Sequence, residues 1–303
     1  MTSIAPLSYL LLIGCIAFGS AAELSQEGLR ELQKHECGVF DKKDLALNNN
    51  EVNLGSRPWM ALLKIVIKDE ERIACTGTLI SDQFVLTAGH CVSGFEVKLV
   101  RLGEHDRSTD LDCRTYDNKE KCLPAVEDIG VDEVIIHPDF RHSVHPNDIA
   151  LVKLSRKVEI KDHIRPICLP VNAELQQKVD TLESMLLTAW GVENRDSDKL
   201  NKLREVAQAN VDRAKCQESI QKHHPTIKID PAQFCTYMNG ILCHGTSGSP
   251  LSSPVEYAGK ERFVQFGIVT YGETRCTTEA LGVNTNVASF MPWITGVVGE
   301  KPQ

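Results

Sequence analysis

The cysteines constrain the fold of this chain more than any other feature. Eleven are present, and all but Cys15 lie beyond an apolar N-terminal run. A zinc site needs short clusters of cysteine or histidine, whereas most spacings here are long. An even number of cysteines in a secreted chain favours five disulfides instead. The ten are Cys37, Cys75, Cys91, Cys113, Cys122, Cys168, Cys216, Cys235, Cys243 and Cys276.

The N-terminal run is the reason for expecting a secreted chain. Residues 6–18 are mostly apolar, and Ser20 and Ala22 lie three and one positions before a possible cleavage ahead of Glu23. A buried or membrane-spanning helix is the alternative, but the run is too short to cross a bilayer comfortably. We therefore expect a signal peptide over residues 1–22 and a secreted, extracellular protein with no membrane association.

Charge limits the classes of partner. The chain has 303 residues and a formal net charge of −8 at pH 7, without a long basic run. Nucleic acid is therefore not an expected partner. Residues 23–45 form a short polar segment, in which Leu24, Leu29 and Leu32 suggest a brief helix.

Short β-forming runs recur after residue 50, separated by Gly, Pro, Asp and Asn. Many short strands between turn signals predict an antiparallel barrel or sandwich. The expected strands are residues 61–67, 84–87, 96–102, 131–136, 149–154, 263–271 and 282–287. The expected helices are residues 207–222 and 288–298.

Three local sequences carry residues suited to nucleophilic catalysis. Residues 87–91 read TAGHC, residues 147–151 read NDIAL, and residues 243–251 read CHGTSGSPL. A serine hydroxyl needs a histidine as base and a buried carboxylate to orient the imidazole. Each sequence alone is usually structural, but their order is that of chymotrypsin-type proteases. The candidate catalytic residues are His90, Asp148 and Ser247.

Further motifs extend the match. They are residues 58–63 (PWMALL), 101–104 (RLGE), 163–170 (HIRPICLP), 189–191 (AWG), 282–287 (GVNTNV) and 293–294 (WI). With these motifs in order, residues 46–298 resemble the trypsin/chymotrypsin family, most closely the protease domains of insect clip-domain serine proteases and serine protease homologues. The resemblance implies an all-β fold of two six-stranded antiparallel barrels with a C-terminal helix. The triad would lie in the cleft between the barrels.

The resemblance also implies a division of the chain and a disulfide map. A segment over residues 23–45, tethered by Cys37, would precede a protease domain over residues 46–303. A clip domain needs six upstream cysteines, so none is expected. The implied pairs are Cys37 with Cys168, Cys75 with Cys91, Cys113 with Cys122, Cys216 with Cys235, and Cys243 with Cys276.

The activation machinery of the family is altered. Its zymogens are cut after a basic residue, and the new N-terminus pairs with an aspartate just before the serine. Here the new N-terminus would be Ala46, after Leu45 rather than a basic residue, and the aspartate position holds Thr246. A buried carboxylate without its cation would cost on the order of several kcal/mol. The loss of the cleavage site is therefore consistent with the loss of the aspartate. Thr246 has no charge with which to drive the switch.

The oxyanion hole and the specificity pocket also depart from the family. Gly245 and Ser247 would supply the oxyanion-hole amides, but the glycine expected two residues after the nucleophile is Ser249, whose Cβ restricts the backbone. The pocket position that holds aspartate in trypsin-like enzymes is Ile241. Gly272 and Gly282 match the glycines that keep the pocket open, so an apolar preference is expected.

No cofactor and no metal are expected. Glu104 lies in an acidic loop that resembles a calcium site in some relatives, but one matching residue does not define a metal site. Solvated surface charge is the preferred interpretation of that loop.

Three functions remain open. The first is a weakly active or non-proteolytic homologue that regulates an insect immune or melanisation cascade by binding protein substrates, partner proteases or inhibitors. The second is an active endopeptidase with a non-tryptic, apolar preference. The third is a secreted binding domain unrelated to such cascades. A monomer is expected in each case.

Overall fold

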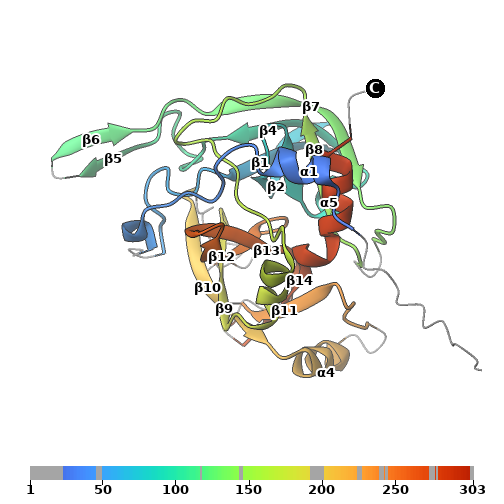
Figure 1. Ribbon diagram of the computed structural model, residues 1–303. Coiled ribbons are helices and arrows are strands. Elements are labelled where there is room, and N and C mark those ends of the chain that lie inside the picture. The colour runs from blue at the N-terminus through green and yellow to red at the C-terminus, as the bar shows by residue number, and fades with distance from the viewer. Residues whose placement is uncertain are drawn as a thin grey trace, which may run out of the picture.

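The computed structural model describes residues 23–45, 50–116, 118–142, 146–191, 201–223, 227–238, 242, 245–272, 277 and 279–300. The described chain is built around two closed six-stranded antiparallel barrels, which confirms the expected architecture (Figure 1). The predicted signal peptide lies outside the described residues. No helix in the described part of the chain has the length and apolar character needed to cross a membrane.

The first barrel follows the order β1-β2-β3-β8-β7-β4. Its strands are β1 (Met60–Ile67), β2 (Glu70–Leu79), β3 (Phe84–Thr87), β4 (Glu96–Leu102), β7 (Glu127–Ile136) and β8 (Ala150–Leu154). In so narrow a barrel, side chains fill the interior, so strands such as β1 and β3 are apolar over nearly their whole length. Between β4 and β7, the hairpin of β5 (Cys113–Tyr116) and β6 (Lys119–Cys122) extends away from the barrel (Figure 1).

The second barrel follows the order β10-β11-β14-β13-β12-β9. Its strands are β9 (Ser184–Ala189), β10 (Arg204–Val211), β11 (Gln233–Tyr237), β12 (Pro250–Tyr257), β13 (Lys260–Gly272) and β14 (Leu281–Asn286). The helices are α1 (Gln26–Leu32), α2 (Gly89–Val92), α3 (Ala173–Gln177), α4 (Arg213–His223) and the C-terminal α5 (Met291–Val298). Three 3-10 turns accompany them, at Lys42–Leu45, Lys178–Asp180 and Val287–Phe290.

One predicted helix is wrong over its first third. Residues 207–211 belong to β10, where they pair with β9 and β11. The helix begins only after Asp212, whose Oδ1 accepts hydrogen bonds from the N–H groups of Ala214 and Lys215. Such a cap satisfies amides that an α-helix leaves unpaired in its first turn. The alanines of residues 207–209 favour a helix locally, but pairing within the barrel decides their conformation.

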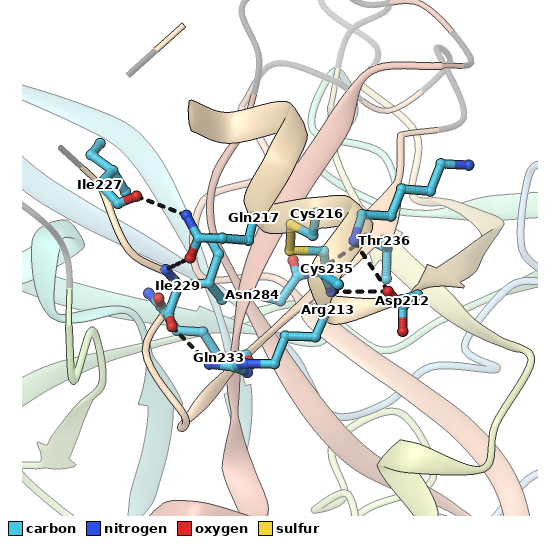
Figure 2. Close-up of a disulfide and its surroundings, with 12 residues drawn as sticks. Asp212, Arg213, Cys216, Gln217, Ile227, Ile229, Gln233, Cys235, Thr236 and Asn284 are labelled. Carbon is cyan, nitrogen blue, oxygen red and sulfur yellow. Dashed lines mark hydrogen bonds between the residues drawn. A yellow bond between two sulfur atoms is a disulfide. The ribbon is translucent and has the colours of Figure 1, made fainter. Parts of the chain in front are cut away.

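Four disulfides join the described cysteines. They are Cys37–Cys168, Cys75–Cys91, Cys113–Cys122 and Cys216–Cys235, the same pairs that the family resemblance implies. Figure 2 shows the last of these, which ties α4 to β11. Cys243 and Cys276 lie outside the described residues.

The N-terminal segment packs on the domain rather than trailing from it. Helix α1 lies beside α5 (Figure 1), and the two helices approach so closely that a Cβ on Gly28 would fall 1.9 Å from the carbonyl oxygen of Thr295. Further along, the Gly38 N–H donates to Pro166, and the Gly38 carbonyl accepts from the N–H of Phe263. The Cys37–Cys168 disulfide therefore links to the domain a segment that also contacts it through hydrogen bonds and helix packing.

A buried ion pair joins the two barrels. Arg57, just before β1, donates through Nε to Glu205 Oε2 of β10 at 2.7 Å, and its guanidinium lies 4.5 Å from the ring centre of Phe263. Thr188 of β9 donates to the same carboxylate oxygen at 2.7 Å. Both charged side chains are essentially inaccessible to solvent. Removing either partner would leave the other charge buried without its complement.

We expect the R57M variant to lower the free energy of unfolding by about 3–5 kcal/mol, because Glu205 would stay buried and, among the described residues, would keep Thr188 as its one side-chain donor. R72M is the matched control, since Arg72 pairs with Glu70 on the exposed surface and should change stability by less than ~1 kcal/mol. Urea unfolding followed by circular dichroism measures both. Equal, small effects of the two substitutions would contradict the role given to Arg57.

Candidate active site

His90 and Asp148 lie at the ends of two paired strands of the first barrel. His90 is on the short helix α2 after β3, and Asp148 lies two residues before the start of β8, which pairs with β3. The His90 Nδ1 group donates to Asp148 Oδ2 at 2.7 Å, and the His90 backbone N–H donates to Oδ1 at 2.8 Å. The carboxylate is fully buried. This bidentate contact fixes the orientation of the imidazole, as a general base beside a serine requires.

The second barrel holds Asp148 from the other side. Thr285 of β14 donates its hydroxyl hydrogen bond to the Asp148 carbonyl at 2.9 Å, and its hydroxyl lies 3.0 Å from that of Thr270 on β13. Sequence reasoning missed both threonines, because nothing local distinguishes them from other threonines in strands.

Ser247 lies on the loop that leads into β12 and meets the first barrel. The Ser247 carbonyl accepts from the N–H of Thr76 on β2 at 3.0 Å. The next residue, Gly248, has φ +77°, and a Cβ there would fall 2.2 Å from the Thr76 carbonyl oxygen and 2.5 Å from Thr87 Oγ1. Thr87 ends β3, three residues before His90. The structure therefore brings the segment of Ser247 to the same junction between barrels as His90 and Asp148.

Gly245 has the backbone conformation that only glycine adopts without strain. Its φ is +77°, and space beside it is open except for the Trp190 carbonyl at 3.6 Å from a built Cβ. Within the described residues, no carbonyl accepts a hydrogen bond from the backbone N–H of Gly245 or Ser247. Two such donors could stabilise a developing oxyanion if they converge on it.

Thr246 and Ser249 are both buried in this loop. The Thr246 carbonyl accepts from the Ser249 N–H at 3.0 Å, so a tight turn encloses the nucleophile position. Ser249 is not among the described non-glycine residues with positive φ, and the restriction of the backbone by its Cβ stays a prediction. The Ser249 hydroxyl is buried and has no hydrogen-bond partner among the described residues, which carries a cost of its own. Ala46, the expected new N-terminus, lies outside the described residues.

The expected specificity pocket is described only in part. Gly272 and Gly282 face each other across β13 and β14. Ile241 and His244 lie outside the described residues, whereas Leu242 is buried in the core of the second barrel. Sequence reasoning missed Met238, whose side chain packs against both glycines. A single methionine after a strand carries no local signal of such a position.

The interpretation of Glu104 as solvated surface charge is wrong, because its residue is only 6% exposed. Its carboxylate accepts from the His105 N–H at 3.1 Å and lies 3.4 Å from the Arg101 guanidinium. Burial raises the pKa of Glu104, and the nearby Asp112 carboxylate adds to the rise. Asp112 in turn accepts from the N–H groups of His105 and Asp106. The two carboxylates therefore organise the loop internally.

Among the described residues, two groups of side chains have the spacing of metal ligands. One contains His90 with Cys75 and Cys91, and the other contains Glu120 with Cys113 and Cys122. In both groups the cysteines form a disulfide, so neither offers a thiolate.

We expect G248A to be destabilised by about 1–3 kcal/mol more than G259A. Both glycines have φ near +78°, but a Cβ on Gly259 meets nothing within 4 Å, whereas one on Gly248 would collide with Thr76. The pair thus separates backbone strain from the close approach of the barrels. Thermal and urea unfolding of the two variants measure the difference, and equal losses would show that the approach is not constrained.

Comparisons with known proteins agree with this geometry. The sequence model of the family described as Trypsin matches residues 46–294. "Serine protease grass" of Drosophila melanogaster is 39% identical, covering 89% of this chain and 71% of that protein. "Phenoloxidase-activating factor 3" of Holotrichia diomphalia is 35% identical, covering 86% and 74%. The crystal structure of the Drosophila Grass clip serine protease of the Toll pathway superposes with a TM-score of 0.80 at 33% identity, covering 90% of this chain and 77% of the other. The chain therefore belongs to the trypsin family, among relatives that are insect CLIP-domain serine proteases.

Proposed function

We propose that this chain is a secreted serine protease homologue, weakly active or non-proteolytic, that regulates a protease cascade of insect immunity or melanisation. One observation carries the proposal: the buried residue directly before Ser247 is the neutral Thr246. The names of the relatives, which include a phenoloxidase-activating factor and a Spaetzle-processing enzyme, support the cascade.

The physical argument concerns the switch from zymogen to enzyme. In the resembling family, an N-terminal ammonium reaches the aspartate at this position and shapes the oxyanion hole. Thr246 offers a hydroxyl and no charge, so a cation placed beside it would lose its hydration without gaining a counter-charge. Cleavage near Ala46 would therefore leave the site without the ionic interaction that orders it.

Such a protein would act by binding. Its expected partners are protein substrates, partner proteases or their inhibitors. A trypsin-type fold would offer these partners a complementary surface to bind. A monomer that occupies a partner in this way alters the cascade without cutting anything. His90, Asp148 and Ser247 would then be retained in a site that reacts slowly.

A fluorophosphonate probe tests the catalytic part of this proposal. We expect Ser247 in the secreted, uncleaved protein to be labelled at least ~10²-fold more slowly than the serine of active trypsin, the loss that a misformed oxyanion hole produces. S247A gives the background, and H90A separates base-assisted labelling from slow intrinsic reaction. Rapid, stoichiometric labelling that requires His90 would overturn the proposal.

The regulatory part needs a measurement in the cascade itself. Purified protein is added to insect haemolymph, and the onset of phenoloxidase activity after microbial challenge is recorded. We expect wild-type protein and S247A to shift the onset equally, because binding rather than cleavage carries the effect. No shift from either protein would argue for a binding domain outside such cascades.

A specific observation favours a second function, that of an active endopeptidase with a non-tryptic, apolar preference. The His90–Asp148 contact at 2.7 Å has the geometry of a working base and its orienting carboxylate. A peptide library digested with pure protein distinguishes the two functions. Cleavage that disappears in both S247A and H90A would support the endopeptidase. In the haemolymph assay, such an enzyme would shift the onset of phenoloxidase activity as wild-type protein but not as S247A.

A further inference from the structure

Met238 occupies the space that two facing glycines leave open. A Cβ built on Gly272 would lie 2.9 Å from the Met238 sulfur, and one built on Gly282 would lie 3.6 Å from Met238 Cγ. Because Gly272 and Gly282 are partners across β13 and β14, the methionine side chain spans the pair. Its residue is only 8% exposed and packs with Ala280 in a small cluster.

The glycines that Met238 covers are connected to the candidate active site through strand β13. Strand β13 reaches Gly272 three residues after Val269, and the backbone of Val269 is hydrogen-bonded to Gly248 and Ser249 of the nucleophile loop. Met238 also begins the nine-residue stretch of chain that leads from β11 to Ser247. The methionine that covers the glycines therefore packs on the strand that is hydrogen-bonded to the loop of Ser247.

Hydrogen bonds and a disulfide hold the backbone around Met238 in place. Its N–H donates to the Ala280 carbonyl at 2.7 Å. Three residues earlier, Cys235 is bonded to Cys216 of α4 (Figure 2). Between them, Thr236 donates to Gln208 and accepts from Asn284. The end of β11 is thus fixed by a disulfide and by buried hydrogen bonds.

We infer that Met238 closes the primary specificity pocket of this chain, so that the pocket admits no side chain much larger than a methyl group. The inference assigns a specificity-determining role to Met238, and it rests on the placement of the nucleophile at Ser247. An apolar preference would accordingly narrow to small residues. Peptides with bulky side chains would have to displace a buried methionine before they could bind.

The consequence is a cavity that a single substitution creates. Removing the side chain beyond Cβ leaves apolar space against bare glycine, and such cavities stay dry and bind small aromatic molecules. In M238A, we expect indole to bind at least about tenfold more tightly than in wild type. Isothermal titration and the rise in melting temperature with indole concentration measure this.

Three control variants define the site. M238L keeps the space filled and should not bind indole. M185A removes a methionine from the core of the same barrel, away from the two glycines, and shows what a cavity elsewhere does. The double variant M238A/G272V refills the space from the opposite wall and should abolish the binding. If M238A is too unstable, M238V with benzene as the probe provides the same comparison.

The outcomes separate this inference from the proposed function. Indole binding to M238A supports the inference if the added G272V substitution abolishes it. Because indole binding does not require the Ser247 hydroxyl, it must persist when S247A is added to M238A. Binding to wild type as tight as to M238A, no binding to folded M238A or M238V, or binding that survives G272V overturns it. Rapid fluorophosphonate labelling of wild type would instead defeat the non-proteolytic function and leave the role of Met238 to be decided by indole.

Discussion

Gly248 brings the second barrel so close to the first that a single added carbon would fall 2.2 Å from the Thr76 carbonyl oxygen. Packing this tight fixes the loop of Ser247 relative to β2 and β3, and β3 leads directly to His90. Thr285 binds the Asp148 carbonyl across the same junction. Neither barrel alone carries all three candidate catalytic residues. Their arrangement therefore depends on the contact between the two barrels.

Buried charge follows a consistent rule around this junction. Arg57 and Glu205 are buried together with matched hydrogen bonds, and Asp148 is buried against His90. The family resemblance implies an aspartate at the position before Ser247, where this chain has the neutral and buried Thr246. A charge without its complement is costly in the interior, so loss of one partner favours loss of the other. Glu104 shows the alternative response, in which burial raises the pKa of a carboxyl group that stays in place.

Local patterns predicted much of this fold and part of the site. The runs at residues 84–87 and 96–102 coincide with β3 and β4, because alternating or continuous apolar residues reflect burial directly. The first third of the helix predicted from residue 207 failed, since alanines that favour a helix are paired into β10. Among the barrel strands, β2, β9, β11 and β12 were not predicted, because strand preference depends on the cross-strand and same-face neighbours that only the folded barrel supplies.

The order of the histidine, aspartate and serine motifs and the even set of cysteines can be read from residue types and spacing, whereas the altered activation positions are implied only by the family resemblance. Met238 over its two glycines, the unpaired hydroxyl of Ser249 and the burial of Glu104 could not be read that way. Each of these depends on which distant residues meet in space. Residue identity determines which chemistry is available, whereas packing between segments decides which groups are buried, paired or blocked.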